Sequence, residues 1–333
     1  MKIYNMKIKK NYVYSGIFFG AVIIIAFIYL KPLLLKEKIS EEKPKEEDKI
    51  AWSVDKDGYL FYPLDRGDIK FRRDNYNETE NLTISKMIYQ STRGNVYGLL
   101  VLPKSASDLL PGVVLLPGAG VSKESELELA KKIAELGAAV LVIDQRGVGE
   151  TGGIFPTLDE DYASFLAAKE PYQHLMVYDA LRAYDLLYSA PFVDPERIII
   201  IGESLGGRVA IIAAAIDRNI KGVLAISASG LSFKPKGDAG KDAFLKSIDS
   251  DHYIDLLTPR KVVMIHNSYD KAIPVSSAIY SYSKAQEPKH FILINDTNCA
   301  HGYCDSMYDG LVESLDYLVG IRSKTLISLP ATK

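Results

Sequence analysis

From residue 112 onward, hydrophobic residues gather in short runs that alternate with helix-type patterns. The runs cover residues 112–116, 138–143, 197–201, 221–226, 261–265 and 290–294. Because uninterrupted runs of Val, Ile and Leu indicate strands buried on both faces, they predict an α/β fold with a mostly parallel central sheet and helices on both of its faces. One helix is predicted to follow Ser122 as its N-cap and to end at Gly137; others are predicted at 172–189, 205–216, 275–286 and 305–319.

A different pattern precedes these runs. Residues 59–62, 81–89 and 95–102 alternate apolar with polar side chains, which predicts short, largely antiparallel strands. Two stretches, 150–171 and 228–258, interrupt the later alternation and carry several aromatic residues. Since both follow strand ends, where open α/β sheets bind ligands, we interpret them as small lid or pocket-wall insertions; surface loops with aromatic anchors are the alternative.

The N-terminal region has a separate organisation. Residues 12–30 contain no charged side chain and are long enough for a helix to cross a bilayer, which predicts a transmembrane anchor. A cleaved secretory signal and a buried core helix are the alternatives, but the run lacks a small-residue cleavage pattern and a polar stripe. The predicted organisation is a tail at 1–11, the anchor, a charged tether at 31–50, an α/β domain at 51–325 and a tail at 326–333.

The orientation of the anchor is indicated by charges on its two sides. Four lysines and the amino terminus precede it, against three closely following lysines, which favours a cytoplasmic N-terminus and an extracytoplasmic body. The sequons that begin at Asn77, Asn81 and Asn295 agree with that side, although such three-residue matches arise readily by chance.

Composition excludes several classes of protein. The 333 residues carry 40 Lys and Arg against 42 Asp and Glu, and 47% are hydrophobic, so the chain is neither disordered nor strongly basic. A net charge of -2 gives no reason to expect a nucleic-acid partner. Cys299 and Cys304 are the only cysteines, and the sequence leaves open whether they form a disulfide.

The strongest chemical motif is Gly202-Glu203-Ser204-Leu205-Gly206, which lies between a predicted strand and a predicted helix. A serine raised on such a sharp turn needs neighbours without side chains two positions away, and Gly202 and Gly206 meet that need. The strand-to-helix context therefore predicts Ser204 as a nucleophile rather than part of a plain tight turn.

A serine hydroxyl needs a base and an acid that orients the base. Asp270 and His301 each follow a predicted strand, and the chain order Ser204, Asp270, His301 is the one expected for this architecture. The remaining histidines fit less well by position, namely His174, His252, His266 and His290. Asp296 and Asp305 are the alternative acids.

Two backbone N–H groups are predicted to bind the oxyanion. One is that of Leu205, at the start of the helix after the serine. The other comes from the loop after the first core strand, LLPGAG, where we expect the Ala119 N–H. A structural turn is the alternative for this loop.

These residues resemble the α/β-hydrolase fold family over residues 85–325. The resemblance rests on the serine turn 202–206, on Asp144-x-Arg146-Gly-x-Gly149, on His266-x-x-x-Asp270 and on Ala300-His301-Gly302. The leading strands and the LLPGAG loop look like the branch of dienelactone hydrolases, acyl esterases and prolyl-oligopeptidase catalytic domains. Members of that branch cleave esters, thioesters or peptides through an acyl-serine. This chain has Pro117-Gly118 where the branch usually has His-Gly.

Two other motifs are weaker. Residues 147–152 match G-x-G-x-x-G, but Gly153-Ile-Phe-Pro follows instead of a helix, which argues against a dinucleotide site. Cys299-x-His301-x-x-Cys304 offers only three crowded metal ligands, so no metal and no cofactor is expected.

The sequence thus predicts a membrane-anchored serine hydrolase that cleaves a small acyl ester or thioester. A serine peptidase that acts on short peptides is the first alternative. A tethered interaction protein without activity is the second, because a fold does not prove catalysis.

Overall fold

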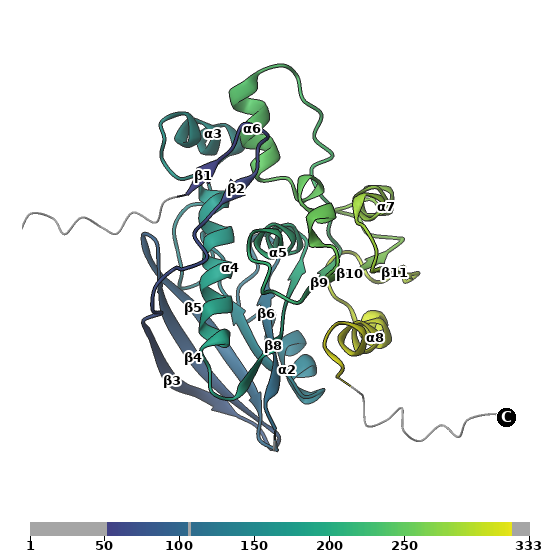
Figure 1. Ribbon diagram of the computed structural model, residues 1–333. Helices are drawn as coiled ribbons and strands as arrows, with labels where there is room; N and C mark the ends of the chain where they lie inside the picture. Colours follow the sequence, from purple (N-terminus) through teal and green to yellow (C-terminus); the bar gives the residue numbers. More distant parts are fainter. Residues whose placement is uncertain (1–51, 106–107, 322–333) are drawn as a thin grey trace, which may run out of the picture. The chain divides into compact units, whose positions relative to one another are not determined.

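The computed structural model describes residues 52–105 and 108–321 (Figure 1). The predicted tails at 1–11 and 326–333, the anchor at 12–30 and the tether at 31–50 lie outside these residues. Within the described ranges, no helix combines the length and the apolar character that a bilayer crossing requires.

One sheet of nine strands organises the described residues, in the order β11-β10-β9-β8-β6-β7-β5-β4-β3. Its strands are β3 (Phe71–Glu78), β4 (Leu82–Ser91), β5 (Gly94–Pro103), β6 (Leu110–Leu116), β7 (Ala139–Ile143), β8 (Val193–Glu203), β9 (Gly222–Ile226), β10 (Lys261–Asn267) and β11 (Lys289–Ile294). In this spatial order, the six strands β11, β10, β9, β8, β6 and β7 pair in parallel with their neighbours. Strands β3, β4 and β5 form an antiparallel extension in which β5 pairs with β7. The predicted mostly parallel sheet is confirmed.

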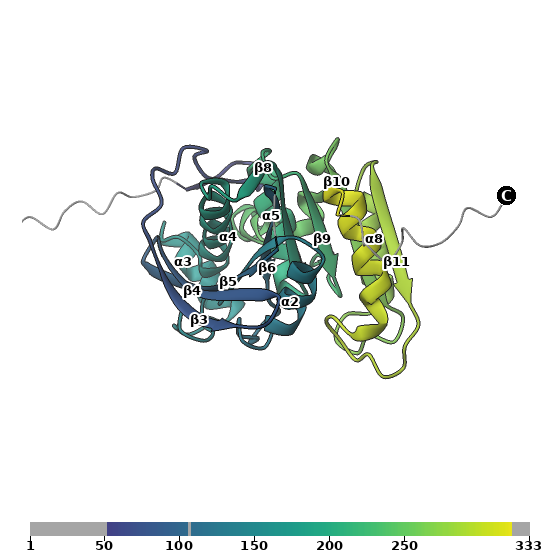
Figure 2. The ribbon, with the colours of Figure 1, turned by 90° about the horizontal axis from the view of Figure 1, so that it is seen from below.

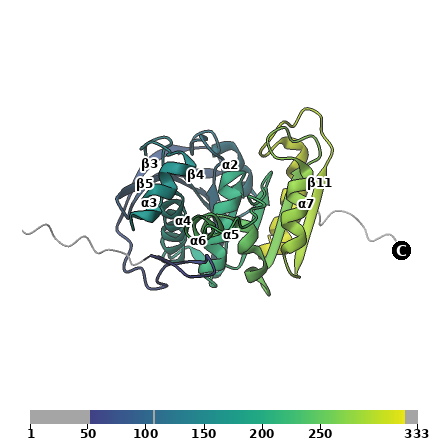
Figure 3. The same cartoon turned by 90° about the horizontal axis from the view of Figure 1, so that it is seen from above.

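Helices cover both faces of this sheet because successive strand residues point to opposite sides. Helices α4 (Tyr172–Tyr188), α5 (Leu205–Ile216) and α7 (Val275–Lys284) pack on one face, with strand residues such as Ile198 and Ile200. Helices α2 (Leu127–Glu135) and α8 (Tyr308–Val319) pack on the other, with Ile199 and Ile201. Figure 2 shows α8 in front of the sheet, and Figure 3, from the opposite side, shows α7 in front of β11.

The two aromatic insertions contact each other. The first contains α3 (Leu158–Leu166), and the second contains α6 (Ala239–Ser247) with two 3-10 turns at Ser250–His252 and Ile254–Leu257. The ring of Phe244 lies 5.5 Å from Tyr162 and 5.6 Å from Phe165. Segments far apart in sequence are thus joined by an aromatic cluster.

Several predicted boundaries were wrong. Helix α2 begins at Leu127 with Glu126 as its N-cap residue, and Ser122 instead starts a turn in which its carbonyl accepts the Ser125 N–H. The strand at 59–62 is reduced to β2 (Leu60–Phe61), which pairs with β1 (Ser53–Val54) in a separate sheet. Strand β3 was not predicted, because nearly all its residues are exposed and it carries no hydrophobic alternation.

Candidate active site

Ser204 lies on a strained turn between β8 and α5. Its backbone has φ 51° and ψ -115°, a left-handed conformation that is uncommon for a residue with a side chain. The glycines on either side allow the close approach: a Cβ on Gly202 would lie 2.2 Å from the Gly206 carbonyl oxygen, and one on Gly206 would lie 2.1 Å from that of Leu116. The motif thus forms the sharp turn that its spacing predicts.

The loop after β6 lies beside this turn. A Cβ on Gly118 would be 3.5 Å from the Ser204 Cβ, so the two backbones are neighbours. The buried side chain of Gln145 donates a hydrogen bond to the Pro117 carbonyl, which fixes the start of the loop. Among the described residues, neither the Ala119 N–H nor the Leu205 N–H has a hydrogen-bond acceptor. Both donors remain available to a ligand.

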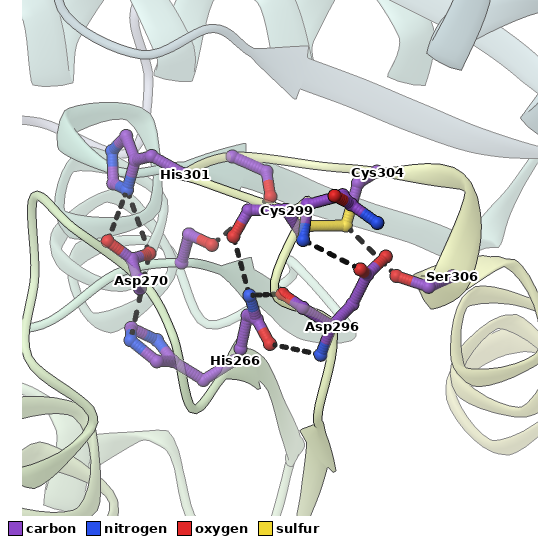
Figure 4. The surroundings of a disulfide bond; sticks show 11 residues. His266, Asp270, Asp296, Cys299, His301, Cys304 and Ser306 are labelled. Carbon is purple, nitrogen blue, oxygen red and sulfur yellow. Dashed lines mark hydrogen bonds and ion pairs between the residues drawn. A yellow bond between two sulfur atoms is a disulfide. The ribbon is translucent and has the colours of Figure 1, made fainter.

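Asp270 and His301 form a direct contact. The Nδ1 of His301 lies 3.0 Å from Oδ1 and 2.8 Å from Oδ2 of Asp270. Figure 4 shows the rings of His301 and His266 on opposite sides of this carboxylate. His266 is 3.8 Å from Asp270 Oδ2 and hydrogen-bonds through Nε2 to the Ile273 carbonyl, 2.9 Å away. Ser204 Oγ and His301 Nε2 make no hydrogen bond within the described part of the chain.

The carboxylate of Asp270 is stabilised in its ionised form. Its side chain is fully buried, and burial alone opposes ionisation. The Ile273 N–H and the Ala272 N–H donate to Oδ1 at 2.8 and 2.9 Å, and together with His301 they hold the pKa of Asp270 below its ordinary value. An ionised acid at this place favours a proton on Nδ1 of His301, which leaves Nε2 as a proton acceptor.

The loop that carries His301 is braced by its neighbours. Cys299 and Cys304 form a disulfide around it (Figure 4). The side-chain amide of Asn267, at the end of β10, donates to the carbonyls of Cys299 and Asp296. The Ser227 hydroxyl donates to the Gly302 carbonyl over 3.2 Å. The disulfide, which the sequence left open, thus joins the two thiols that a metal site at this motif would need.

The alternative acids and bases have other contacts. Asp296 accepts the Asn298 N–H, and Asp305 pairs with Lys132 at 2.6 Å, so neither contacts His301. His174 is fully buried at 2.6 Å from the Ser247 hydroxyl, and burial lowers its pKa to about 3. His290 lies 3.4 Å from Glu313 at an exposed position.

The segment after β7 has a structural use for its glycines. Asp144 is fully buried, accepts the Lys123 ammonium at 2.7 Å and also accepts the Glu150 N–H at 2.9 Å. A Cβ on Gly149 would lie 2.3 Å from this carboxylate. The helix that follows, α3, begins only at Leu158, so this G-x-G-x-x-G match does not open a helix as a dinucleotide turn does.

A carboxyl pair next to the serine was missed from the sequence. Glu203 precedes Ser204 directly, and Glu126 precedes α2; both side chains are buried, and each affects the ionisation of the other. The middle position of G-x-S-x-G identifies Glu203 as adjacent to the site. Nothing in the sequence indicates that Glu126 lies near Glu203, because their proximity depends on how α2 packs.

No group of three or more His, Cys, Asp or Glu suited to a metal occurs among the residues described.

Comparison with known proteins places this geometry among relatives. The profile of the acetyl xylan esterase (AXE1) family matches residues 65–233. YfhR of Escherichia coli O157:H7 is 29% identical over 151 residues, which are 44% of this chain and 53% of YfhR. The chain therefore spans about half the length of this relative.

Solved structures show the same fold at lower sequence identity. An acetyl xylan esterase from Paenibacillus sp. R4 matches with a TM-score of 0.65 and 20% identity, over 76% of this chain and 90% of that one. Est1E from Butyrivibrio proteoclasticus, whose structure holds ferulic acid, matches with a TM-score of 0.52 and 19% identity, over 67% and 93%. These matches confirm the resemblance to the α/β-hydrolase fold.

Proposed function

The chain belongs to the acetyl xylan esterase (AXE1) family, and from that premise we propose that it is a serine hydrolase that cleaves carboxylic esters through an acyl-serine intermediate. The observation that carries the proposal is the two-oxygen contact of Asp270 with Nδ1 of His301, at the same sheet edge as the strained Ser204 turn. Esters or thioesters of small acyl groups are the proposed substrates.

In the proposed reaction, Ser204 Oγ attacks the acyl carbonyl while His301 Nε2 accepts its proton. Asp270 accepts the Nδ1–H, holds the ring in the required tautomer and stabilises the imidazolium that forms. The Ala119 and Leu205 N–H groups donate to the oxyanion, and each such donor contributes about 3 kcal/mol to lowering the barrier. His301 then gives that proton to the ester oxygen as the acyl–oxygen bond breaks, so the alcohol departs, and water releases the acyl group by the same route.

Ester chemistry is tested by profiling the full-length protein against p-nitrophenyl esters, acyl thioesters and aminoacyl anilides. We expect turnover of a short-chain p-nitrophenyl ester to exceed that of every anilide, because p-nitrophenolate is a weak base that leaves readily, whereas the nitrogen of an anilide must be protonated before it leaves. A preference for anilides would identify a peptidase instead. Absence of turnover on all three classes would favour a protein that keeps the fold without activity.

The N-terminal run at 12–30 is proposed to anchor this hydrolase in a membrane, with the body on the extracytoplasmic side. The disulfide in the His301 loop supports that side, because disulfides persist in oxidising compartments. Protease added to intact cells is expected to degrade the body while a cytoplasmic control protein survives. A body that is degraded only after lysis would show the opposite orientation.

A further inference from the structure

Two buried carboxyl groups lie next to the proposed active site. Glu203 is 7% exposed and Glu126 is 6% exposed. They come from different elements: Glu203 ends β8 one residue before Ser204, and Glu126 is the N-cap residue of α2. Burial of two carboxylates side by side would be costly, so their hydrogen bonding and proton content require an explanation.

One oxygen of Glu203 faces the loop that carries His301. A Cβ on Gly302 would lie 2.8 Å from Glu203 Oε2, and Gly302 has φ 76°. The backbone N–H of Tyr303 and a charge on His301 both favour the ionised form of this carboxylate. Glu203 therefore lies against the backbone immediately after the histidine.

The other carboxylate oxygen of Glu203, Oε1, is buried and lacks a hydrogen-bond donor among the described N–H and hydroxyl groups. The Glu126 carboxyl borders the same cavity and affects the ionisation of Glu203, but two ionised carboxylates cannot donate to each other. A proton on Glu126 supplies the missing donor and reduces the charge of the pair from two to one.

We propose that Glu126 and Glu203 share one proton and act as a positioning pair, in which the remaining negative charge on Glu203 fixes the His301 loop and stabilises the imidazolium. This inference rests on the proposed function, since it assigns a second negative group to the proposed base. Asp270 orients the ring through Nδ1, whereas Glu203 acts on the backbone that follows the ring.

The raised pKa of Glu126 agrees with a proton on this carboxyl group. Burial, followed by the nearby charge of Glu203, raises the pKa of Glu126 to about 8. An unfolded chain would release this proton near 4.5, so between these values the folded state binds more protons. The pair's contribution to stability is therefore fully present below 4.5 and is lost as pH rises through about 8.

The other charged side chains around the pair form ion pairs with one another. A cavity of about 460 Å³ borders Glu126, Glu203 and His301. On its wall, Lys132 pairs with Asp305 at 2.6 Å, and Glu128 pairs with Lys131 at 2.7 Å, while Tyr303 adds a phenol. Glu128 is exposed and on the same helix, so Glu128→Gln is a matched control that removes one carboxylate outside the pair.

Carboxyl titration by carbon-13 NMR of full-length protein labelled at glutamate tests the shared proton without any need for activity. One resonance is expected to titrate near pH 8, to be absent in Glu126→Gln and to move to lower pH in Glu203→Gln; Glu128→Gln keeps it. Absence of such a resonance in the wild type overturns the proposal, even if a variant fails to fold.

The positioning role is tested by the pH profile of kcat on the best ester. Glu203→Gln keeps an oxygen at this position but moves the negative charge of the pair from Glu203, beside the His301 loop, to Glu126. The acid limb is therefore expected to move down by roughly half to one pH unit, with KM little changed. Glu126→Gln, which leaves Glu203 ionised, is expected to keep the limb in place. A Glu203→Gln profile identical to that of Glu128→Gln overturns the role.

Failure of the proposed function gives a different result. If no ester is cleaved, the ring signals of His301 can be followed by NMR in the same variants, and Glu203→Gln is still expected to change them while Glu128→Gln leaves them unchanged. Loss of activity with an intact carboxyl titration would thus contradict the hydrolase and leave the pair supported.

Discussion

Replacement of Ser204 by alanine is expected to lower kcat on a p-nitrophenyl ester by on the order of 10⁵- to 10⁶-fold, because it removes the proposed nucleophile. The variant should fold normally, since alanine removes one partly exposed oxygen that has no hydrogen bond among the described residues. Initial rates with purified wild type and variant measure the loss. Residual turnover above the water reaction would come from the oxyanion donors and binding.

A fluorophosphonate probe gives an independent readout of the same nucleophile. Wild type is expected to be labelled and Ser204→Ala is not. Ser306→Ala, which removes a serine hydroxyl from an exposed position near the disulfide, should label like wild type. Persistent labelling of Ser204→Ala would assign the reactive hydroxyl to another residue and remove the basis of the proposed mechanism.

The central sheet could be predicted from the sequence because its strands are buried on both faces. Every residue of β6, β7 and β9 is buried. Strands of this kind appear in the sequence as uninterrupted apolar runs. The order of the strands fixes which ends lie together, so the contact of Asp270 with His301 could also be anticipated. Chain order and topology carried that prediction, without knowledge of any side-chain conformation.

Features that depend on packing between distant segments could not be predicted. The edge strand β3 is almost fully exposed, so its sequence shows no alternation of apolar and polar residues that would predict a strand. The start of α2 shifted to Leu127 because a turn at 122–126 leads the chain past buried Lys123, whose partner Asp144 comes from another loop. Glu126 meets Glu203 for the same reason: its position is set by that turn and not by any local motif.

The contacts of the His301 loop explain how it can hold the proposed base in place. The disulfide closes the loop at residues 299 and 304, Asn267 ties its first half to β10, and Ser227 ties Gly302 to the end of β9. The side chain of His301 is 29% exposed while its acid partner is fully buried. A rigid backbone below a solvent-accessible ring is what proton transfer to and from a substrate requires.

Replacement of Asp270 by asparagine is expected to lower kcat by about 10⁴-fold while the fold is retained, because it reverses the tautomer of His301. Oδ1 accepts the Ala272 and Ile273 N–H groups, so the asparagine oxygen should take that position and its NH₂ group the position of Oδ2, which faces Nδ1 at 2.8 Å. The NH₂ would donate to Nδ1, leave the ring proton on Nε2 and prevent it from accepting the serine proton. Steady-state rates and the tautomer seen by nitrogen-15 NMR check both steps. Asp296→Asn, at the alternative acid, is the control; a larger loss there than at Asp270 would show that the wrong carboxylate had been chosen.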